Sequence, residues 1–488
     1  MLERISGKNE FNTKPGAEGL TIGEALFPVP FKSYLEFNPP AHGTWNIVHT
    51  GMLVPEAHII YVCAAGCLRG VVLTAAEMGT SERFSNISVR EHDILGDSME
   101  RLIIEGVSDM INRLERRPPA IMIYTSCVHN FMGTDLKYIY KTLRERFPDI
   151  DFTDGYMTPI MKKTMPPDVR TWVSVYSLLH GSPPQVPGNV PGRSLEADGS
   201  RHKPDASCLD RKSVNIIGCD LPLHDSCELI ELAREAGIML REVTKCKTYG
   251  EFQEMASSYM NICIQPVGLR AMAEQEVRLG QSGVYLPLTY DYDVIRGQLR
   301  ALTRELGISE KDWTKAVDAC EKAAALAAEA VGDREISIDV SATPRPLGLA
   351  KYLTEHGMKV GSLFLDAFNK EEEDEYSWLC ENAPEIMIYP VVDPVMRTFK
   401  RGTGALGGAG AGEFAGATGG SGAGVVAIGQ KAAYFNGTPY FVNIVEGGAL
   451  YGYDGIACLM DMIAKAAAVE KDTKDIIPRK AIGCMSVI

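Results

Sequence analysis

Residues 58–78 read HIIYVCAAGCLRGVVLTAAEM, and this stretch combines two local patterns. Its first six residues form an apolar run rich in strand-forming side chains, which is typical of a buried strand. Three small residues then separate Cys63 from Cys67, and apolar residues at helical spacing follow. The stretch therefore predicts a strand, a short turn and a helix, which together begin a parallel βαβ unit.

The same order of patterns recurs along the chain. Strand-like runs followed by helical segments occur at AIMIYTSC (120–127), VNIIGC (214–219), MNICIQ (260–265) and ISIDVS (336–341), and further strand-like runs occur at EIMIYPVV (385–392) and PYFVNIV (439–445). Strands that alternate with helices favour right-handed crossovers and parallel sheets. Because the runs are too many for one small sheet, we predict an α/β fold with three Rossmann-like domains, each with a mostly parallel sheet flanked by helices.

Changes in composition predict where these domains begin and end. Residues 181–213 are rich in proline, glycine and serine, which indicates a linker or long surface loop. Residues 304–331 form an alanine-rich helical pattern that bridges into the last domain. We therefore predict a cluster-binding domain over 1–205 with an N-terminal extension and a linker, a second domain over 206–332, and a third over 333–488.

The composition excludes several classes of function. The chain has 488 residues and a net charge of −14, with no basic stripe, so nucleic acid is not an expected ligand. No stretch approaches the roughly 20 consecutive apolar residues of a membrane span. The N-terminal residues are polar and lack the apolar core of a signal peptide. We therefore expect a cytoplasmic protein that does not enter a membrane.

Twelve cysteines in a cytoplasmic chain are expected to be buried thiols, reactive thiols or metal ligands, because disulfides are rare there. Cys227, Cys320, Cys380 and Cys458 lie within helical patterns, where a free cysteine behaves as a small hydrophobic residue. We interpret these four as packing residues.

Cys63, Cys67 and Cys127 have a different setting, because each lies at or just after the end of a predicted strand. Ligands of open parallel sheets bind beyond the carboxyl ends of the strands. Helix N-termini at that edge are expected to lower the thiol pKa and to favour thiolate, the form that binds iron. The alternative is two buried thiols and one redox-sensitive thiol, and the C-x3-C spacing alone leaves both interpretations open.

Three motifs in order carry a resemblance to a known family. They are AGC (65–67), TSCVHNFMGTDL (125–136) and EGGALYGYDGIACLMDMI (446–463). Together they resemble the nitrogenase component 1 family, over residues from about 38 to 465. The resemblance implies that Cys67 and Cys127, the latter followed by Gly133 and Asp135, are ligands of an iron–sulfur cluster.

The chain also departs from the family pattern. The family has another cysteine about 25 residues before the Gly-Cys, whereas this chain has His42 near that place. Cys63 as a replacement ligand and His42 as a nitrogen ligand are both candidates, although a lone histidine in such a loop is more often structural. Val442 lies where true nitrogenases have a cofactor-anchoring histidine, so dinitrogen reduction is not expected. Cys263 is a candidate ligand of a second metallocofactor, with a buried core thiol as the alternative.

The glycine-rich stretch 401–429 has eleven glycines within 402–424. It is expected to be a lid or linker, or a loop whose bare backbone N–H groups bind an anionic ligand. Its candidate contacts are Gly407, Gly408, Gly419 and Gly420. Tyr451 and Tyr453 are candidates for positioning the substrate, with helix entry as the alternative, and Asp454 is expected to cap a helix that begins near Gly455.

Family resemblance implies an oxidoreductase, a nitrogenase-like component 1 subunit. It would hold an iron–sulfur cluster and receive electrons from a separate ATP-dependent iron–sulfur reductase. It would pass them to a substrate or to a second metallocofactor. A homologous subunit or a second copy is implied, because three ligands leave a cluster incomplete. The alternatives are a metallocofactor assembly scaffold without turnover, and a small-ligand binding protein built from Rossmann domains.

Overall fold

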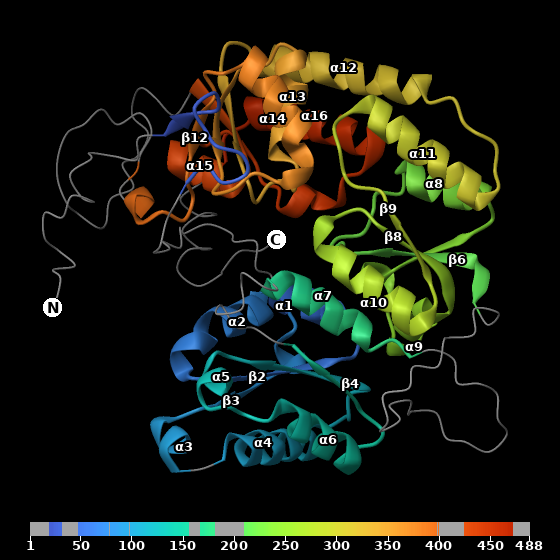
Figure 1. Cartoon of the computed structure of the whole chain (residues 1–488), viewed down its shortest axis with the longest axis vertical. Coiled ribbons are helices and arrows are strands. Elements are labelled where there is room, and N and C mark those ends of the chain that lie inside the picture. The colour runs from blue at the N-terminus through green and yellow to red at the C-terminus, as the bar shows by residue number, and fades with distance from the viewer. Residues whose placement is uncertain are drawn as a thin grey trace, which may run out of the picture.

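The computed structural model describes residues 19–31, 47–77, 79–96, 98–155, 166–180, 209–397, 399 and 424–471. Within these ranges three β-sheets follow one another along the length of the molecule, each flanked by helices (Figure 1). The predicted α/β fold with several mostly parallel sheets is confirmed. No helix in the described ranges is long and apolar enough to cross a membrane.

The first unit contains a four-stranded parallel sheet with the strand order β3-β2-β4-β5. Its strands are β2 (His58–Cys63), β3 (Phe84–Ser88), β4 (Ala120–Thr125) and β5 (Asp151–Asp154). Strands β2 and β4 are buried along their whole length, because helices cover both faces of the sheet. The chain passes from β2 to β3 on one side and later to β4 on the other. The sheet therefore has a topological switch point between β2 and β4.

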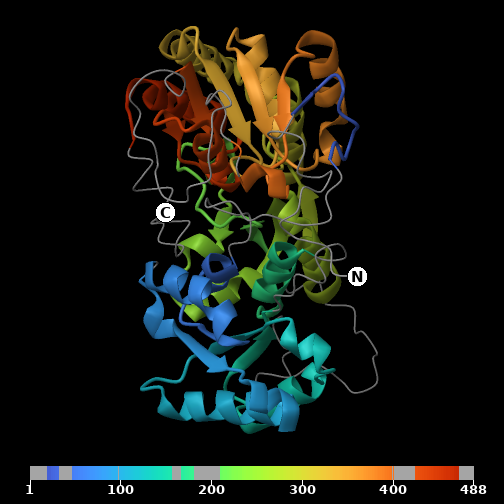
Figure 2. The same cartoon turned by 90° about the vertical axis from the view of Figure 1, so that its left-hand side faces the viewer.

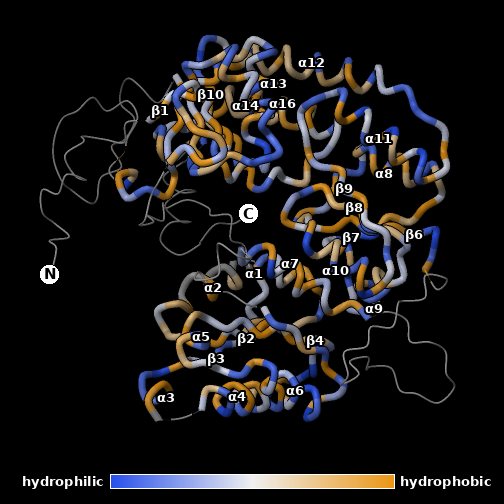
Figure 3. The backbone as a smooth tube through the Cα atoms, in the orientation of Figure 1, coloured by the Kyte–Doolittle hydropathy of each residue, from blue (hydrophilic) through white to orange (hydrophobic). Residues whose placement is uncertain are grey.

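Helices cover the two faces of this sheet differently. They are α1 (Ile47–Met52), α2 (Ala65–Glu77), α3 (Glu91–Gly96), α4 (Met99–Arg113), α5 (Val128–Phe131), α6 (Leu136–Arg146) and α7 (Pro167–Ser177). Ile60 and Val62 face α4 and α6, where hydrophobic and hydrophilic residues alternate along each helix (Figure 3). Ile59, Tyr61 and Cys63 face the opposite way, into an apolar cluster with α1 and α7. This second face is the one directed toward the next unit.

The second unit repeats the same topology. Its parallel strand order is β7-β6-β8-β9, which gives a switch point between β6 and β8. Its elements are β6 (Asp210–Ile217), α8 (Glu228–Glu235), β7 (Met239–Glu242), α9 (Tyr249–Glu254), β8 (Ser258–Cys263), α10 (Leu269–Leu279), β9 (Ser282–Tyr285) and α11 (Tyr292–Leu306). Helix α7 of the first unit packs on α10, and this contact joins the two units (Figure 1).

The third unit has a six-stranded sheet with the order β1-β12-β11-β10-β13-β14. Its strands are β1 (Leu20–Thr21), β10 (Glu335–Asp339), β11 (Val360–Phe364), β12 (Met387–Tyr389), β13 (Val425–Ile428) and β14 (Phe441–Val442). Its helices are α12 (Thr314–Val331), α13 (Pro346–Glu355), α14 (Glu373–Asn382), α15 (Gln430–Asn436) and α16 (Gly452–Ala468). The long helices α12 and α16 pack against each other in this unit. Figure 2 shows the third unit, orange to red, at the opposite end of the molecule from the blue first unit.

Two segments differ from the sequence-based division. Residues 19–31 were expected in the first domain, but β1 pairs antiparallel with β12 and so belongs to the third sheet. Pairing covers the backbone groups of an edge strand, which is a physical reason for this placement. The expected loop 401–429 extends too far, because its residues Val425–Ile428 form the buried strand β13 between β10 and β14. Residues 401–423 lie outside the described residues.

The third unit contains a buried carboxyl group that titrates in an unusual range. Glu372 is fully buried beside α13, where one carboxyl oxygen accepts the N–H of Gly348 at 2.8 Å. Burial raises its pKa to about 8, although Arg345 partly opposes this. Between the ordinary pKa of a glutamate in the unfolded chain and the value of about 8 in the folded chain, the Glu372 carboxyl group is therefore more fully protonated in the folded state.

We expect the free energy of unfolding to fall as pH rises from about 5 to about 8, by at most about 1.4 kcal/mol per pH unit from this group. Glu372→Gln keeps an oxygen for the Gly348 N–H and cannot ionise, so it should flatten this part of the profile. Urea unfolding across that pH range measures the slope. Glu373→Gln, an exposed neighbour, is the control. A slope in Glu372→Gln equal to that of the parent would contradict the assignment.

Candidate functional site

Three cysteines lie at the switch point of the first sheet. Cys63 is the last residue of β2, Cys67 is the third residue of α2, and Cys127 follows β4 as the N-cap residue of α5. The Ser126 N–H donates to the Val62 carbonyl oxygen at 3.1 Å, so the two strand ends lie side by side. The structure therefore brings all three predicted cysteines to one edge of one sheet.

Burial distinguishes these three thiols. Cys67 is exposed, Cys127 is partly buried, and Cys63 is 1% exposed. The buried Tyr61 has a pKa raised first by desolvation and then by nearby groups that include all three cysteines. The three thiols thus lie in one neighbourhood at the sheet edge, with Cys67 exposed and Cys63 buried.

The expected lowering of the thiol pKa is wrong for Cys63. Its pKa is raised to about 12, mainly by burial and further by the neighbouring Cys67. The side chain packs in the apolar cluster with Tyr61 and Tyr124, where desolvation outweighs any helix dipole. This placement favours a packing role for Cys63, and its role as a metal ligand stays a prediction.

The surroundings of Cys67 and Cys127 fit part of an iron–sulfur cluster. Space beside α2 is open among the described residues, because a side-chain carbon added at Gly66 would meet none of their atoms within 4 Å. Cluster thiolates can bind different iron atoms, so the sulfurs need not meet around a single ion. The two thiols would supply some of the usual four ligands. The rest would come from other residues of this chain or from a second chain.

A second site lies where the three units meet, and sequence reasoning missed it. We name Asp168, Asp220 and Glu446 the three-carboxylate cluster. Asp168 lies in the first turn of α7, Asp220 follows β6, and Glu446 begins a short 3-10 turn (Glu446–Ala449) before α16. His49 of α1 adjoins the cluster, with its Nε2 atom 3.8 Å from the Asp220 carboxylate and 3.1 Å from the Asp220 carbonyl oxygen.

All three carboxyl groups have a raised pKa. Burial raises the pKa of Asp168 and of Asp220, and His49 partly opposes the shift at Asp220. The pKa of Glu446 lies well above its usual value, because the group is desolvated and faces both Asp220 and Asp168. Among the described residues, one buried oxygen of Asp168, Oδ1, has no hydrogen-bond partner. Burial, and at Glu446 the neighbouring carboxyl groups, favour the protonated form of each member of the cluster.

The backbone holds Glu446 in an unusual conformation. Its φ of +53° is in the left-handed region, which residues other than glycine rarely adopt. The Glu446 N–H donates to the Ser341 carbonyl at 2.6 Å, and the side chain of Gln265 donates to the Glu446 carbonyl at 2.8 Å. Ser341 follows β10 of the third sheet and Gln265 follows β8 of the second sheet. Hydrogen bonds from two units therefore hold the backbone of Glu446. Strained residues held in this way gather at functional sites.

The remaining predicted residues have structural partners. Cys263 is fully buried, and its S–H donates to the Gln265 carbonyl at 3.0 Å. The Tyr451 and Tyr453 rings are buried, with hydroxyls donating to Gln298 and to the Tyr292 carbonyl. The roles of these three toward a cofactor or substrate stay predictions. His42 and Gly407, Gly408, Gly419 and Gly420 lie outside the described residues.

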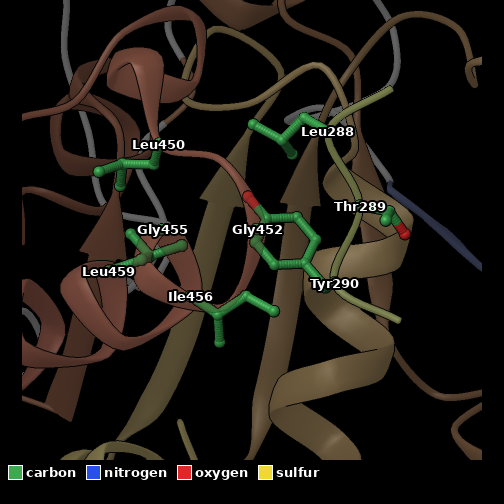
Figure 4. Close-up of a pocket in the computed structure, with 8 residues that line it drawn as sticks. All are labelled: Leu288, Thr289, Tyr290, Leu450, Gly452, Gly455, Ile456 and Leu459. Carbon is green, nitrogen blue, oxygen red and sulfur yellow. The ribbon is translucent and has the colours of Figure 1, made fainter. Parts of the chain in front are cut away.

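The start of α16 corrects one expectation. The helix begins at Gly452 with Tyr451 as its N-cap, so Asp454 lies inside the first turn and does not cap a helix near Gly455. The backbone N–H of Asp454 donates to the buried Glu228 carboxylate at 2.8 Å. Figure 4 shows the small pocket beside this turn, which has a volume of about 10 Å³ and room for about one water molecule. Its lining residues are Leu288, Thr289, Tyr290, Leu450, Gly452, Gly455, Ile456 and Leu459.

Fold and site together define a class of α/β protein in which parallel sheets present thiols and carboxyl groups at their switch points. A family model described as nitrogenase component 1 type oxidoreductase matches residues 48–394, and the chain belongs to this family. The predicted family is thereby confirmed, and with it an oxidoreductase at the coarse level.

Two solved structures are similar in fold. The chain matches "Nitrogenase Cp1 at pH 6.5" with a TM-score of 0.60 and 12% identity, over 90% of this chain and 94% of that one. It matches "Nitrogenase Cp1 at pH 5" with a TM-score of 0.51 and 10% identity, over 91% and 94%. At these identities the likeness shows the fold alone. A search among curated proteins gave no match.

Proposed function

We propose that this chain is a nitrogenase-like component 1 subunit. It receives electrons from a separate ATP-dependent iron–sulfur reductase and passes them to a substrate or metallocofactor where the three units meet. Family membership supports an oxidoreductase. The observation that carries the finer proposal is the pair of outward thiols, Cys67 and Cys127, at the switch point of the first sheet.

In this proposal Cys67 and Cys127 hold an iron–sulfur cluster together with ligands from a homologous subunit or a second copy. When bound, such a cluster supplies one-electron transfer. The chain's own residues fix the thiols on rigid elements at the edge of a buried sheet. Helix α1 contacts both α2, which carries Cys67, and α7, which carries Asp168, so the thiol edge and the three-carboxylate cluster share one packed element.

The three-carboxylate cluster is the proposed source of protons for reduction. A reduction that adds electrons to a bound molecule consumes protons, and the raised pKa values of Asp168, Asp220 and Glu446 favour protonated carboxyl groups there. His49 lies beside Asp220 and positions this part of the cluster. The substrate position proposed here is therefore next to Glu446.

Glu446→Gln is expected to remove a protonated carboxyl group without changing the size of the side chain. At neutral pH the infrared carbonyl band of protonated carboxyl groups should weaken in the variant. Reductase-driven turnover, measured as proton reduction if no other substrate is known, should fall by about 100-fold or more. Asp293→Asn, at an exposed carboxylate outside the cluster, is the control. An unchanged infrared band would show that Glu446 is ionised and would remove this proton-source role.

Anaerobic isolation tests the function as a whole. A protein with bound iron and sulfide that is reduced by the reductase partner and turns over a substrate supports the oxidoreductase. Bound iron without turnover supports the metallocofactor assembly scaffold. Val442 also favours this role, because its buried aliphatic side chain has no atom that could bind a metallocofactor. Absence of iron and sulfide would leave the small-ligand binding protein.

A further inference from the structure

Three side chains with different ligand atoms meet between the second and third units. His224 lies in the connection from β6 to α8, whereas Asp454 and Cys458 are one turn apart on α16. Their ligand atoms all lie within 4.8 Å of one another. In the part of the chain that the structure describes, no other three His, Cys, Asp or Glu side chains meet this closely. The group is separate from both the thiol edge and the three-carboxylate cluster.

The separations match the edges of one metal coordination shell. The His224 Nδ1 atom is 3.4 Å from the Cys458 sulfur and 3.8 Å from a carboxylate oxygen of Asp454. In a tetrahedral zinc site, bonds of about 2.0–2.3 Å put nitrogen and sulfur about 3.5 Å apart and nitrogen and oxygen about 3.4 Å apart. Shifts of a few tenths of an ångström would therefore place all three atoms around one ion.

Helix geometry explains why two of the ligands converge. Residues at positions i and i+4 of a helix lie on the same face, so Asp454 and Cys458 both point toward the second unit. His224 approaches them from a connection that is tied to the start of α8, because the Cys227 N–H donates to the His224 carbonyl at 2.9 Å. The three ligands thus come from two units that pack through α8 and α16.

A buried carboxylate beside the group adds a second, independent observation. Glu228 is 3% exposed, and its buried Oε2 atom has no hydrogen-bond partner among the residues that the structure describes. Its other oxygen accepts the N–H of Asp454 itself. Burying an incompletely paired carboxyl group costs free energy, and nearby positive charge offsets part of the cost. A cation held by the side chain of Asp454 would place positive charge on the same residue that Glu228 contacts.

The opposite side of the group is open. The side chains of His224 and Asp454 are 44% and 23% exposed, so an ion can enter from solvent and keep one water ligand. Nitrogen, carboxylate oxygen and thiolate sulfur in one site suit zinc and similar borderline ions better than magnesium or calcium, which prefer oxygen alone.

We propose that His224, Asp454 and Cys458 bind one divalent transition-metal ion of the zinc class. Binding breaks the S–H bond of Cys458, releases its proton to solvent and forms a metal–thiolate bond, without any change in oxidation state. The ion ties the connection before α8 to α16 and so fixes the second unit against the third. Cys227 and Cys320 are buried in the core as expected, and the partly buried Cys458 also packs against that core. The proposed metal bond would be an additional role of Cys458.

The test uses the full chain with Cys67→Ala and Cys127→Ala as background, so that its result does not depend on the proposed iron–sulfur cluster. We expect this background protein to bind one zinc ion in competition with a chromophoric chelator. Cobalt(II) in place of zinc should give the absorption of a tetrahedral thiolate site. His224→Gln and Cys458→Ser should each lower zinc affinity by about 100-fold or more, because ligands matter at least as much as their outer partners.

Cys380→Ala is the matched control, because Cys380 is also a partly buried thiol but lies outside the group. Thermal unfolding without metal confirms that each variant folds. If the background protein binds no zinc, the proposal is overturned. It is also overturned if folded His224→Gln and Cys458→Ser bind zinc as tightly as the background, or if Cys380→Ala weakens binding equally.

Discussion

Replacing Cys67 or Cys127 with alanine is expected to lower the iron bound to anaerobically isolated protein by about 10-fold or more. Both thiols lie at the switch point between β2 and β4, and both face outward or partly outward beside open space. Loss of either thiolate removes one of the metal bonds proposed for the cluster. Iron and sulfide analysis, with the visible absorption of the cluster, measures the loss.

Alanine variants of Cys63 and Cys380 serve as comparisons that separate loss of a metal ligand from loss of a packed thiol. Cys63→Ala removes a thiol that packs in the apolar cluster, so the variant should keep its iron and lose about 1 kcal/mol of stability. Cys380→Ala should change neither by much. If Cys63→Ala loses as much iron as Cys67→Ala, Cys63 is a ligand after all. Unchanged iron in both the Cys67 and Cys127 variants would defeat the proposed cluster site.

Gly429→Ala is expected to reduce the free energy of unfolding by more than about 3 kcal/mol. Gly429 joins β13 to α15 with φ at +99° and ψ at +159°, a conformation that is open essentially only to glycine. A side-chain carbon there would lie 2.2 Å from a carboxylate oxygen of Asp339. Asp339 is fully buried and accepts the backbone N–H of Ser341 and of Ala432 at 2.8 Å, so it cannot move away without losing both bonds.

Gly437→Ala is a matched control at the other end of the same helix. Gly437 also has a positive φ, +63°, but a side-chain carbon there would meet no atom of the described part of the chain within 4 Å. Only the backbone preference is lost, so we expect a cost of about 1 kcal/mol. Urea unfolding of both variants measures the difference. Equal effects would show that backbone conformation alone, without the contact to Asp339, sets the requirement for glycine at position 429.

Local patterns predicted the elements that depend on neighbouring residues. The run at 58–63 is a strand and the helix after it begins at Ala65, because apolar side chains and small turn residues act over a few positions. The same reasoning placed Cys67 and Cys127 at strand ends. It missed β13, because VVAI directly follows a glycine-rich stretch whose composition dominated the interpretation of the whole segment.

The three-carboxylate cluster could not be predicted in this way. Asp168, Asp220 and Glu446 are far apart in the chain and share no motif, and they meet only because three sheets pack with their switch points together. The left-handed backbone of Glu446 is held by hydrogen bonds to residues distant in sequence, Ser341 of its own unit and Gln265 of the second unit, so its own sequence neighbours do not show it. His224 and Cys458 were missed for the same reason. Contacts between units depend on packing, which periodicity within one segment does not encode.

The pairing of β1 with β12 gives protein synthesis a defined order of events. Thr21 pairs with Met387, so the first strand leaves the ribosome long before its partner. At about 5–20 residues per second, β12 follows β1 by roughly 20 to 70 s. During that interval the sheets of the first two units can form, whereas β1, the edge strand of the third sheet, still lacks the strand with which it pairs. The nascent chain must therefore keep its β1 segment available until almost the whole protein has been made.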